Sequence, residues 1–150
     1  MKPLSTGLCT LAILLISSLS PVQAQTTAAP VSYDTAREVT LACTVSSVLT
    51  KAAPGSIVGS HLLLATPSGS VDASLGRFGF QGYGAVSVAA GQQLEATGVV
   101  KTIKDKPVLL VRIVKVDGKV YTIRNEHGVL LSPQARKRAG QKASQKGQSL

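Results

Sequence analysis

The sequence lacks tryptophan and contains only two phenylalanines, three tyrosines and two cysteines among its 150 residues. Two cysteines exclude a disulfide-dense scaffold, and so few rings argue against an aromatic-lined pocket. Acidic residues are also scarce, because seven Asp and Glu stand against sixteen Lys and Arg, which gives a net charge of +9. The apolar content of 44% excludes a wholly disordered chain, and the length allows one ordinary domain rather than a large enzyme.

The N-terminus has the pattern of a signal peptide. A positive charge at Lys2 precedes an apolar stretch over residues 8–16, and small residues follow up to Ala24. The pattern predicts a signal peptide over residues 1–24 that is cleaved between Ala24 and Gln25, and hence an exported, periplasmic or extracellular protein. The apolar stretch is shorter than the roughly 20 residues that span a bilayer, so no membrane anchor is expected after cleavage. Residues 25–36 are rich in Thr, Ala and Pro and are expected to form a linker.

Cys43 is the one cysteine that remains after cleavage, because Cys9 lies in the signal peptide. It belongs to an alternation that places four side chains on one face of a strand: Val39, Leu41, Cys43 and Val45. We therefore predict an inert core residue whose thiol has a raised pKa. An intermolecular disulfide, or a metal site shared with His61, remains open as an alternative.

The mature chain has a period of two and frequent turn residues. Six strands are expected, over residues 38–48, 61–66, 71–75, 94–103, 108–116 and 120–123. Asp117-Gly118 is the strongest hairpin signal, because a type I′ turn needs positive φ at both central residues. Residues 85–90 are expected to form at most one short helical turn. The pattern predicts an all-β domain over residues 37–131, most simply a small five- to six-stranded barrel, since closure removes exposed sheet edges. A sandwich is the alternative.

The C-terminal segment, residues 132–150, differs from the domain that precedes it. Ser132-Pro133 is a possible helix start, but the residues beyond it offer no apolar face to bury. We therefore predict a disordered basic tail. Its cations are candidates for binding a polyanion or an anionic surface, although a tail that only improves solubility is equally compatible: Arg136, Lys137, Arg138, Lys142 and Lys146.

A glycine-rich loop after the third strand holds three of the five aromatic residues. The order of its glycine, basic and aromatic residues differs from the order in an RNA-stacking strand. The simplest interpretation is that the aromatic rings cover the mouth of the barrel. Because barrels of this kind often bind through their loops, the loop is also a candidate partner-facing surface. The residues concerned are Arg77, Phe78, Phe80 and Tyr83.

Three segments, residues 69–76, 90–98 and 111–128, resemble a group of small exported bacterial modules that are similar to OB-folds. These modules are mostly uncharacterised, and some occur in envelope and magnetosome-associated proteins. The resemblance covers residues 38–131 and implies an OB-like β-barrel. It implies no particular activity.

The sequence predicts no catalytic residue, cofactor or metal. His61 and His127 lack the spacing of a zinc site, and Asp72 with His61 would need a serine on a Gly-x-Ser-x-Gly turn, which does not occur. The leading hypothesis is an exported, non-enzymatic interaction module of the cell envelope, whose partner is an envelope protein or an anionic surface polymer. The alternatives are a nucleic-acid-binding OB-fold and a barrel that binds a small ligand or a metal.

Overall fold

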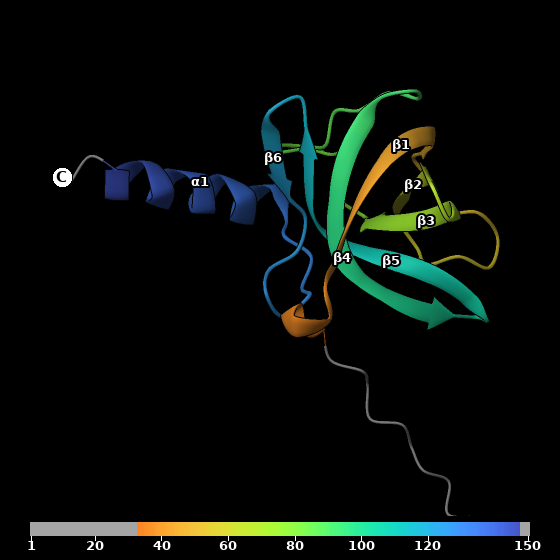
Figure 1. Cartoon of the computed structure of the whole chain (residues 1–150). Helices are drawn as coiled ribbons and strands as arrows, with labels where there is room; N and C mark the ends of the chain where they lie inside the picture. Colours follow the sequence, from red (N-terminus) through yellow and green to blue (C-terminus); the bar gives the residue numbers. More distant parts are fainter. Residues whose placement is uncertain (1–32, 148–150) are drawn as a thin grey trace, which may run out of the picture. The chain divides into compact units, whose positions relative to one another are not determined.

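A computed structural model describes residues 33–147 of the chain. The predicted signal peptide, its cleavage site and residues 25–32 of the predicted linker lie outside the described residues. Within residues 33–147 the elements are six strands, a 3-10 turn and one α-helix (Figure 1): η1 Thr35–Arg37, β1 Val39–Leu49, β2 Ser60–Thr66, β3 Gly69–Gly76, β4 Gln93–Ile103, β5 Lys106–Val116, β6 Lys119–Thr122 and α1 Pro133–Gly147. Among these residues, no helix combines the length and the apolar character needed to cross a membrane.

Five of the strands close into a barrel. The sheet runs in the order β3-β2-β1-β4-β5-β6, and β3 also pairs with the first part of β5. That additional pairing is parallel and joins Asp72 to Val108 and Ser74 to Leu110, so it closes the sheet. The last part of β5 pairs with β6, which therefore lies outside the closed ring. The predicted all-β, OB-like barrel is confirmed, and the sandwich alternative is wrong.

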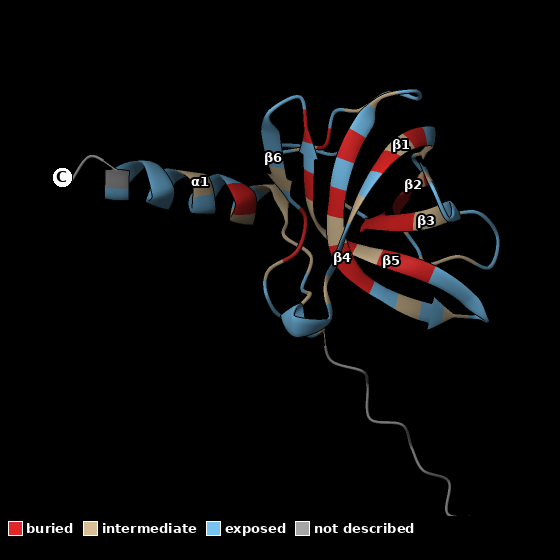
Figure 2. Ribbon diagram, in the orientation of Figure 1, coloured by how far each residue is buried: buried red, intermediate tan, exposed pale blue. Residues whose placement is uncertain are grey.

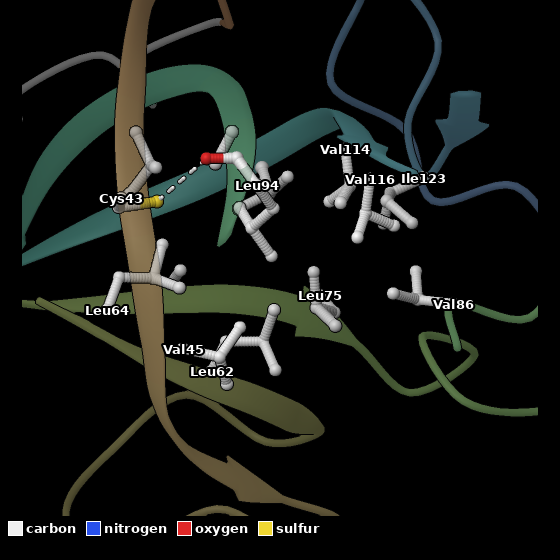
Figure 3. Close-up of a cluster of buried hydrophobic side chains, with 14 residues drawn as sticks. Cys43, Val45, Leu62, Leu64, Leu75, Val86, Leu94, Val114, Val116 and Ile123 are labelled. Carbon is white, nitrogen blue, oxygen red and sulfur yellow. Dashed lines mark hydrogen bonds between the residues drawn. The ribbon is translucent and has the colours of Figure 1, made fainter. Parts of the chain in front are cut away.

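The interior of the barrel is built from the alternating side chains of the strands (Figure 2). Leu62 and Leu64 of β2 are fully buried, as are Ala73 and Leu75 of β3. Cys43 belongs to the same cluster and is 8% exposed, with its Sγ atom 3.6 Å from the carbonyl oxygen of Leu94 (Figure 3). Burial raises the pKa of the Cys43 thiol. The structure confirms that Cys43 is a core residue.

Two of the hairpins have turns with positive φ at both central residues. Asp117 and Gly118 have φ angles of 49° and 72°, which confirms the predicted turn with positive φ at both positions. The turn between β4 and β5 has the same character, with φ angles of 48° at Lys104 and 63° at Asp105. Further along β4 the register shifts next to Gly98, and a Cβ atom there would collide with the carbonyl of Leu110. Glycine is therefore required where β4 bends.

The segment between β3 and β4 contains no helical turn, which agrees with the expectation of at most one over residues 85–90. Val86 instead is 5% exposed and belongs to the core cluster. Its N–H donates to the carbonyl of Gly79 at 2.8 Å. This hydrogen bond ties the segment to the loop that follows β3, and the Val86 side chain lies in the core. Core packing thus overrides the helical preference of an alanine-containing stretch.

The prediction of a disordered tail is wrong for residues 133–147, which form α1. The N–H of Ala135 donates to the Ser132 hydroxyl at 3.2 Å, and Pro133 occupies the first helical position. The helix is attached to the barrel by Arg136, which is 6% exposed and donates from Nη1 to the carbonyl of Gly84 at 3.1 Å. A cap and one buried polar anchor replace the apolar face that the sequence lacks.

Ordered structure also begins earlier than the expected domain boundary. Asp34 caps η1 by accepting a hydrogen bond from the N–H of Ala36 at 2.9 Å. Tyr33 donates from its hydroxyl to Glu38 at 2.6 Å. Residues 33–36 of the predicted linker are therefore part of the folded unit.

Candidate binding cleft

The aromatic loop between β3 and β4 divides its side chains between two environments. Phe80 is half-buried and packs against the core cluster. This position is the one expected for a ring that covers the barrel interior. Phe78 is also half-buried, and the guanidinium carbon of the exposed Arg77 lies 5.7 Å from the centroid of its ring. Tyr83, by contrast, is 56% exposed. Of the four candidate residues, Tyr83 is the one that turns away from the barrel interior toward another element.

Tyr83 and its neighbours meet the first turns of α1. A Cβ atom at Gly140 would lie 3.2 Å from the Tyr83 hydroxyl, and one at Gly82 would lie 2.7 Å from the ring of Pro133. Gly84 accepts the hydrogen bond from Arg136. The structure thus brings together part of the aromatic loop and part of the basic segment, two candidate surfaces that lie about 50 residues apart in the sequence.

A cleft of about 560 Å³ lies where this loop, α1 and β6 meet. All four residues of β6 contribute to it, so the cleft follows the strand. Tyr83, Tyr121 and Leu131 supply apolar surface, while Lys119 and Arg136 supply positive charge. Its lining includes no acidic residue in the described part of the chain. The sequence offered little signal for Lys119 and Tyr121, because a single lysine and a single ring on a hairpin are ordinary surface features.

Arg136 is the most unusual group of this cleft. Its Nη1 atom has a partner, but Nε and Nη2 are buried without a hydrogen-bond acceptor in residues 33–147. Burial lowers the pKa of the Arg136 guanidinium, because a charge without a counterion is costly to remove from water. An anionic group in the cleft would supply the missing opposite charge.

The other cations of α1 point to solvent. Figure 2 shows that buried residues of α1 are confined to its beginning, and Lys137, Arg138, Lys142 and Lys146 are all exposed. Arg138, Lys142 and Lys146 follow one another at intervals of four residues, so they lie along one side of the helix. Like charges at this spacing repel each other. The basic residues therefore separate into one buried anchor, Arg136, and a surface row.

A second cleft, of about 650 Å³, lies at the end of the barrel near Cys43. Its walls include Glu95 and Lys115, which face each other across strands with a carboxylate oxygen and Nζ 3.8 Å apart. The buried polar atoms without partners in the described residues belong to Ser74, Arg124 and Arg136, none of which lines this cleft. The cleft beside α1 is therefore the stronger candidate.

A half-buried ion-pair cluster, for which the sequence carries no signal, joins Tyr33, Glu38 and Arg112. Arg112 of β5 forms two hydrogen bonds to the Glu38 carboxylate, one of them from Nη2 at 2.7 Å, and Tyr33 donates a third. The guanidinium holds the pKa of Glu38 below its ordinary value. Burial and the bond to Glu38 raise the pKa of the Tyr33 phenol. Each acceptor of this cluster is matched by a donor, as in a structural ion pair.

His61 and Asp72 do come together, with Nδ1 2.6 Å from a carboxylate oxygen. The arrangement matches two members of a catalytic triad. However, His61 is 1% exposed and its Nε2 atom lies 2.8 Å from the carbonyl oxygen of Ile57. The nitrogen that would act on a serine is therefore occupied by the backbone, and the pair ties the β1–β2 loop to the barrel.

The histidine is also separated from Cys43. Cys43 lies opposite Leu94 on β4, whereas His61 lies opposite Leu49 near the far end of β1. No group of three or more His, Cys, Asp or Glu side chains suited to a metal ion occurs in residues 33–147. The shared site of Cys43 and His61 that the sequence left open is therefore not formed.

The fold and the cleft define a small closed β-barrel with an outer strand and a basic C-terminal helix. No family model, no curated protein and no solved structure matches the chain. Its function is therefore inferred from its own side chains.

Proposed function

We propose that the protein is an exported, non-enzymatic binding module that attaches to an anionic polymer or surface of the cell envelope through the solvent-facing side of α1. The row formed by Arg138, Lys142 and Lys146 is the single observation that carries this proposal. No Asp or Glu follows Glu126 in the sequence, so nothing along the helix neutralises the row. Over eight residues the row extends about 12 Å, a length suited to a chain of repeated negative charges.

The magnitude of the attraction supports reversible attachment. Each cation near an anionic surface contributes about 1 kcal/mol, so the row and Lys137 together supply about 4 kcal/mol before other losses. Because α1 is already helical, its backbone loses less conformational entropy on binding than a disordered tail would. Screening over a Debye length of about 8 Å at physiological salt weakens the attraction. We therefore expect weak binding that depends strongly on salt.

The barrel surface favours this partner over single-stranded nucleic acid. OB-folds that bind oligonucleotides use strands 2 and 3 and the adjoining loops, with aromatic side chains on which bases stack. Neither β2 nor β3 contains Phe, Tyr or Trp, and the one imidazole on these strands, that of His61, is buried. The barrel thus lacks stacking side chains on these strands, and nucleic-acid binding becomes an outcome that the test can detect.

The test compares two variants that lose the same charge at different places. One carries Arg138→Gln, Lys142→Gln and Lys146→Gln on α1, and the control carries Lys51→Gln, Lys104→Gln and Lys106→Gln on exposed loops and strand ends of the barrel. Binding to anionic phosphatidylglycerol vesicles, neutral phosphatidylcholine vesicles, soluble polyglutamate and a single-stranded oligonucleotide is measured at several salt concentrations.

We expect the α1 variant to bind the anionic vesicles and polyglutamate about 10- to 100-fold more weakly than the wild type, which corresponds to the loss of up to about 3 kcal/mol. The control should bind nearly as the wild type does, and neutral vesicles should bind neither form. Equal losses in both variants would show that only net charge matters and would overturn the proposal. If oligonucleotide binding is lost only in the control variant, whose substitutions lie on the barrel, the nucleic-acid hypothesis would replace the proposal.

A further inference from the structure

The outer strand β6 has one edge that pairs with no other strand. It is the last strand in the sheet order and pairs with β5 alone. Val116 and Lys119 flank the two-residue turn and form a hydrogen-bonded pair, so the next pair, Lys115 with Val120, is not hydrogen-bonded. By the same alternation, the pair of Ile113 with Thr122 is not hydrogen-bonded. The next residue, Ile123, is bonded to β5 again, because its N–H donates to the carbonyl of Arg112. The backbone groups of Val120 and Thr122 therefore point away from β5.

These backbone groups are open to a ligand. Among the backbone hydrogen bonds that residues 33–147 form outside helices and strands, none involves Val120 or Thr122. Val120 is 60% exposed, so its apolar side chain is accessible to a ligand. Both residues line the cleft of about 560 Å³ beside α1. The cleft thus offers donors and acceptors along one strand, together with apolar contact.

The cleft also carries positive charge. Arg136 of α1 has two guanidinium nitrogens without acceptors, and the side chain of Lys119, the first residue of β6, adds a second cation. The described lining contains no carboxylate that could satisfy them. A strand-like ligand with acidic side chains would complement both the free edge and the positive wall.

We propose that the cleft between β6 and α1 binds an extended acidic peptide segment of another protein, which adds as a strand to the free edge of β6. Main-chain hydrogen bonds to Val120 and Thr122 hold the segment, and an acidic side chain faces Arg136 and Lys119. Apolar side chains that alternate with the acids lie on the other face of the added strand, where they contact Val120. This site is separate from the solvent-facing cations of α1 and extends the proposed function with a second, protein-specific contact.

The experiment uses a labelled peptide of alternating Glu and Val and a matched peptide of alternating Lys and Val. Binding to the full mature protein is followed by fluorescence polarisation, and the amide signals of Val120 and Thr122 are followed by NMR. Val120→Pro removes one N–H that faces the cleft and leaves the ladder with β5 intact, because that N–H takes no part in it. Val120→Thr keeps the N–H and serves as the control, and thermal unfolding checks that both variants are folded.

We expect the Glu peptide to bind, to shift the Val120 and Thr122 amide signals, and to bind Val120→Pro about three- to tenfold more weakly, the effect of one lost backbone hydrogen bond. Val120→Thr should bind within about twofold of the wild type. Equal binding of the Lys peptide, or unchanged binding to Val120→Pro, would overturn the proposal. So would wild-type self-association that Val120→Pro abolishes, because the edge would then pair with a second copy of the chain.

The variant Arg138→Gln, Lys142→Gln, Lys146→Gln separates this inference from the proposed function. It should keep its affinity for the Glu peptide within about threefold, because these side chains lie outside the cleft lining. If this variant loses the peptide, the surface row of cations was the binding site, and the cleft proposal fails while the proposed function stands. If it keeps both the peptide and the anionic vesicles, the proposed function fails while the cleft proposal stands.

Discussion

At the scale of single residues, the structure is decided by polar groups whose partners lie far away in the sequence. Glu38 and Arg112 are 74 residues apart and form a two-bond ion pair with exposed side-chain fractions of 11% and 20%. Arg136 reaches Gly84 across 52 residues. Local sequence patterns carry no record of such pairs, since each partner alone has the composition of an ordinary surface position.

The Glu38–Arg112 pair predicts how stability changes with pH. Because the folded-state pKa of Glu38 lies below its unfolded value of about 4.3, the pair stabilises the fold above that pH, and this contribution is lost as pH falls through the folded-state pKa. Glu38→Gln should lower the free energy of unfolding by about 2 kcal/mol at pH 7. The difference between wild type and variant should shrink below about pH 4.

Urea unfolding at a series of pH values measures this difference. Glu126→Gln, in the exposed turn after β6, is the matched control and should leave stability unchanged at pH 7. A difference for Glu38→Gln that stays constant from neutral to acidic pH would contradict the assignment, because the ion pair requires the ionised carboxylate.

At the scale of elements, the strands follow from local pattern and the C-terminal helix does not. The burial of Cys43, Val45, Leu94 and Ala96 reproduces the period of two that the sequence shows. α1 has no apolar face, and the residues that favour it are a cap, a first-turn proline and many helix-forming side chains. A helix with so little burial should depend strongly on its cap and on its charges.

Removal of the cap should therefore be visible in α1 and nearly invisible in the barrel. Ser132→Ala removes the acceptor for the Ala135 N–H and should destabilise the helix by about 1 kcal/mol. Circular dichroism should show reduced helical signal, while the urea midpoint of the barrel should change little. Ser144→Ala, near the other end of α1, is the control and should not reduce the helical signal. Equal helicity in Ser132→Ala and wild type would show that the cap is dispensable.

At the scale of the whole molecule, one buried thiol reports on the integrity of the barrel. Cys43 is nearly inaccessible in the core cluster, and its raised pKa further disfavours the reactive thiolate. In the folded protein it should react with a thiol reagent about 10³-fold or more slowly than in urea, as expected if reaction requires unfolding with a free energy of about 5 kcal/mol.

An added thiol provides the internal control for this measurement. Ser46 lies on the same strand and is exposed, so Ser46→Cys should react rapidly in the folded state while Cys43 does not. Fast reaction of Cys43 in the folded wild type would place the thiol at the surface of the neighbouring cleft, and the core assignment would then be wrong.

The positions of the strands could be predicted from the sequence to within a few residues, because alternation and turn chemistry are local signals. The candidate cleft could be predicted only in pieces. Tyr83 and Arg136 each stood out, one as an aromatic residue in a loop and the other as one of several cations. Their meeting across Gly84 and Gly140, and the part played by β6, depend on how the chain returns to the barrel after the last strand.

By itself, the sequence determined an all-β domain, the place of Cys43 in its core and the turns that join the strands, since each rests on residues close together in the chain. Only the tertiary structure decided that β3 pairs with β5 to close the barrel and that β6 keeps a free edge. It alone decided that one arginine of the basic segment is buried while the others face solvent. The physical reason is that strand closure and the burial of a charge depend on surfaces assembled from distant residues, whose energies no local pattern contains.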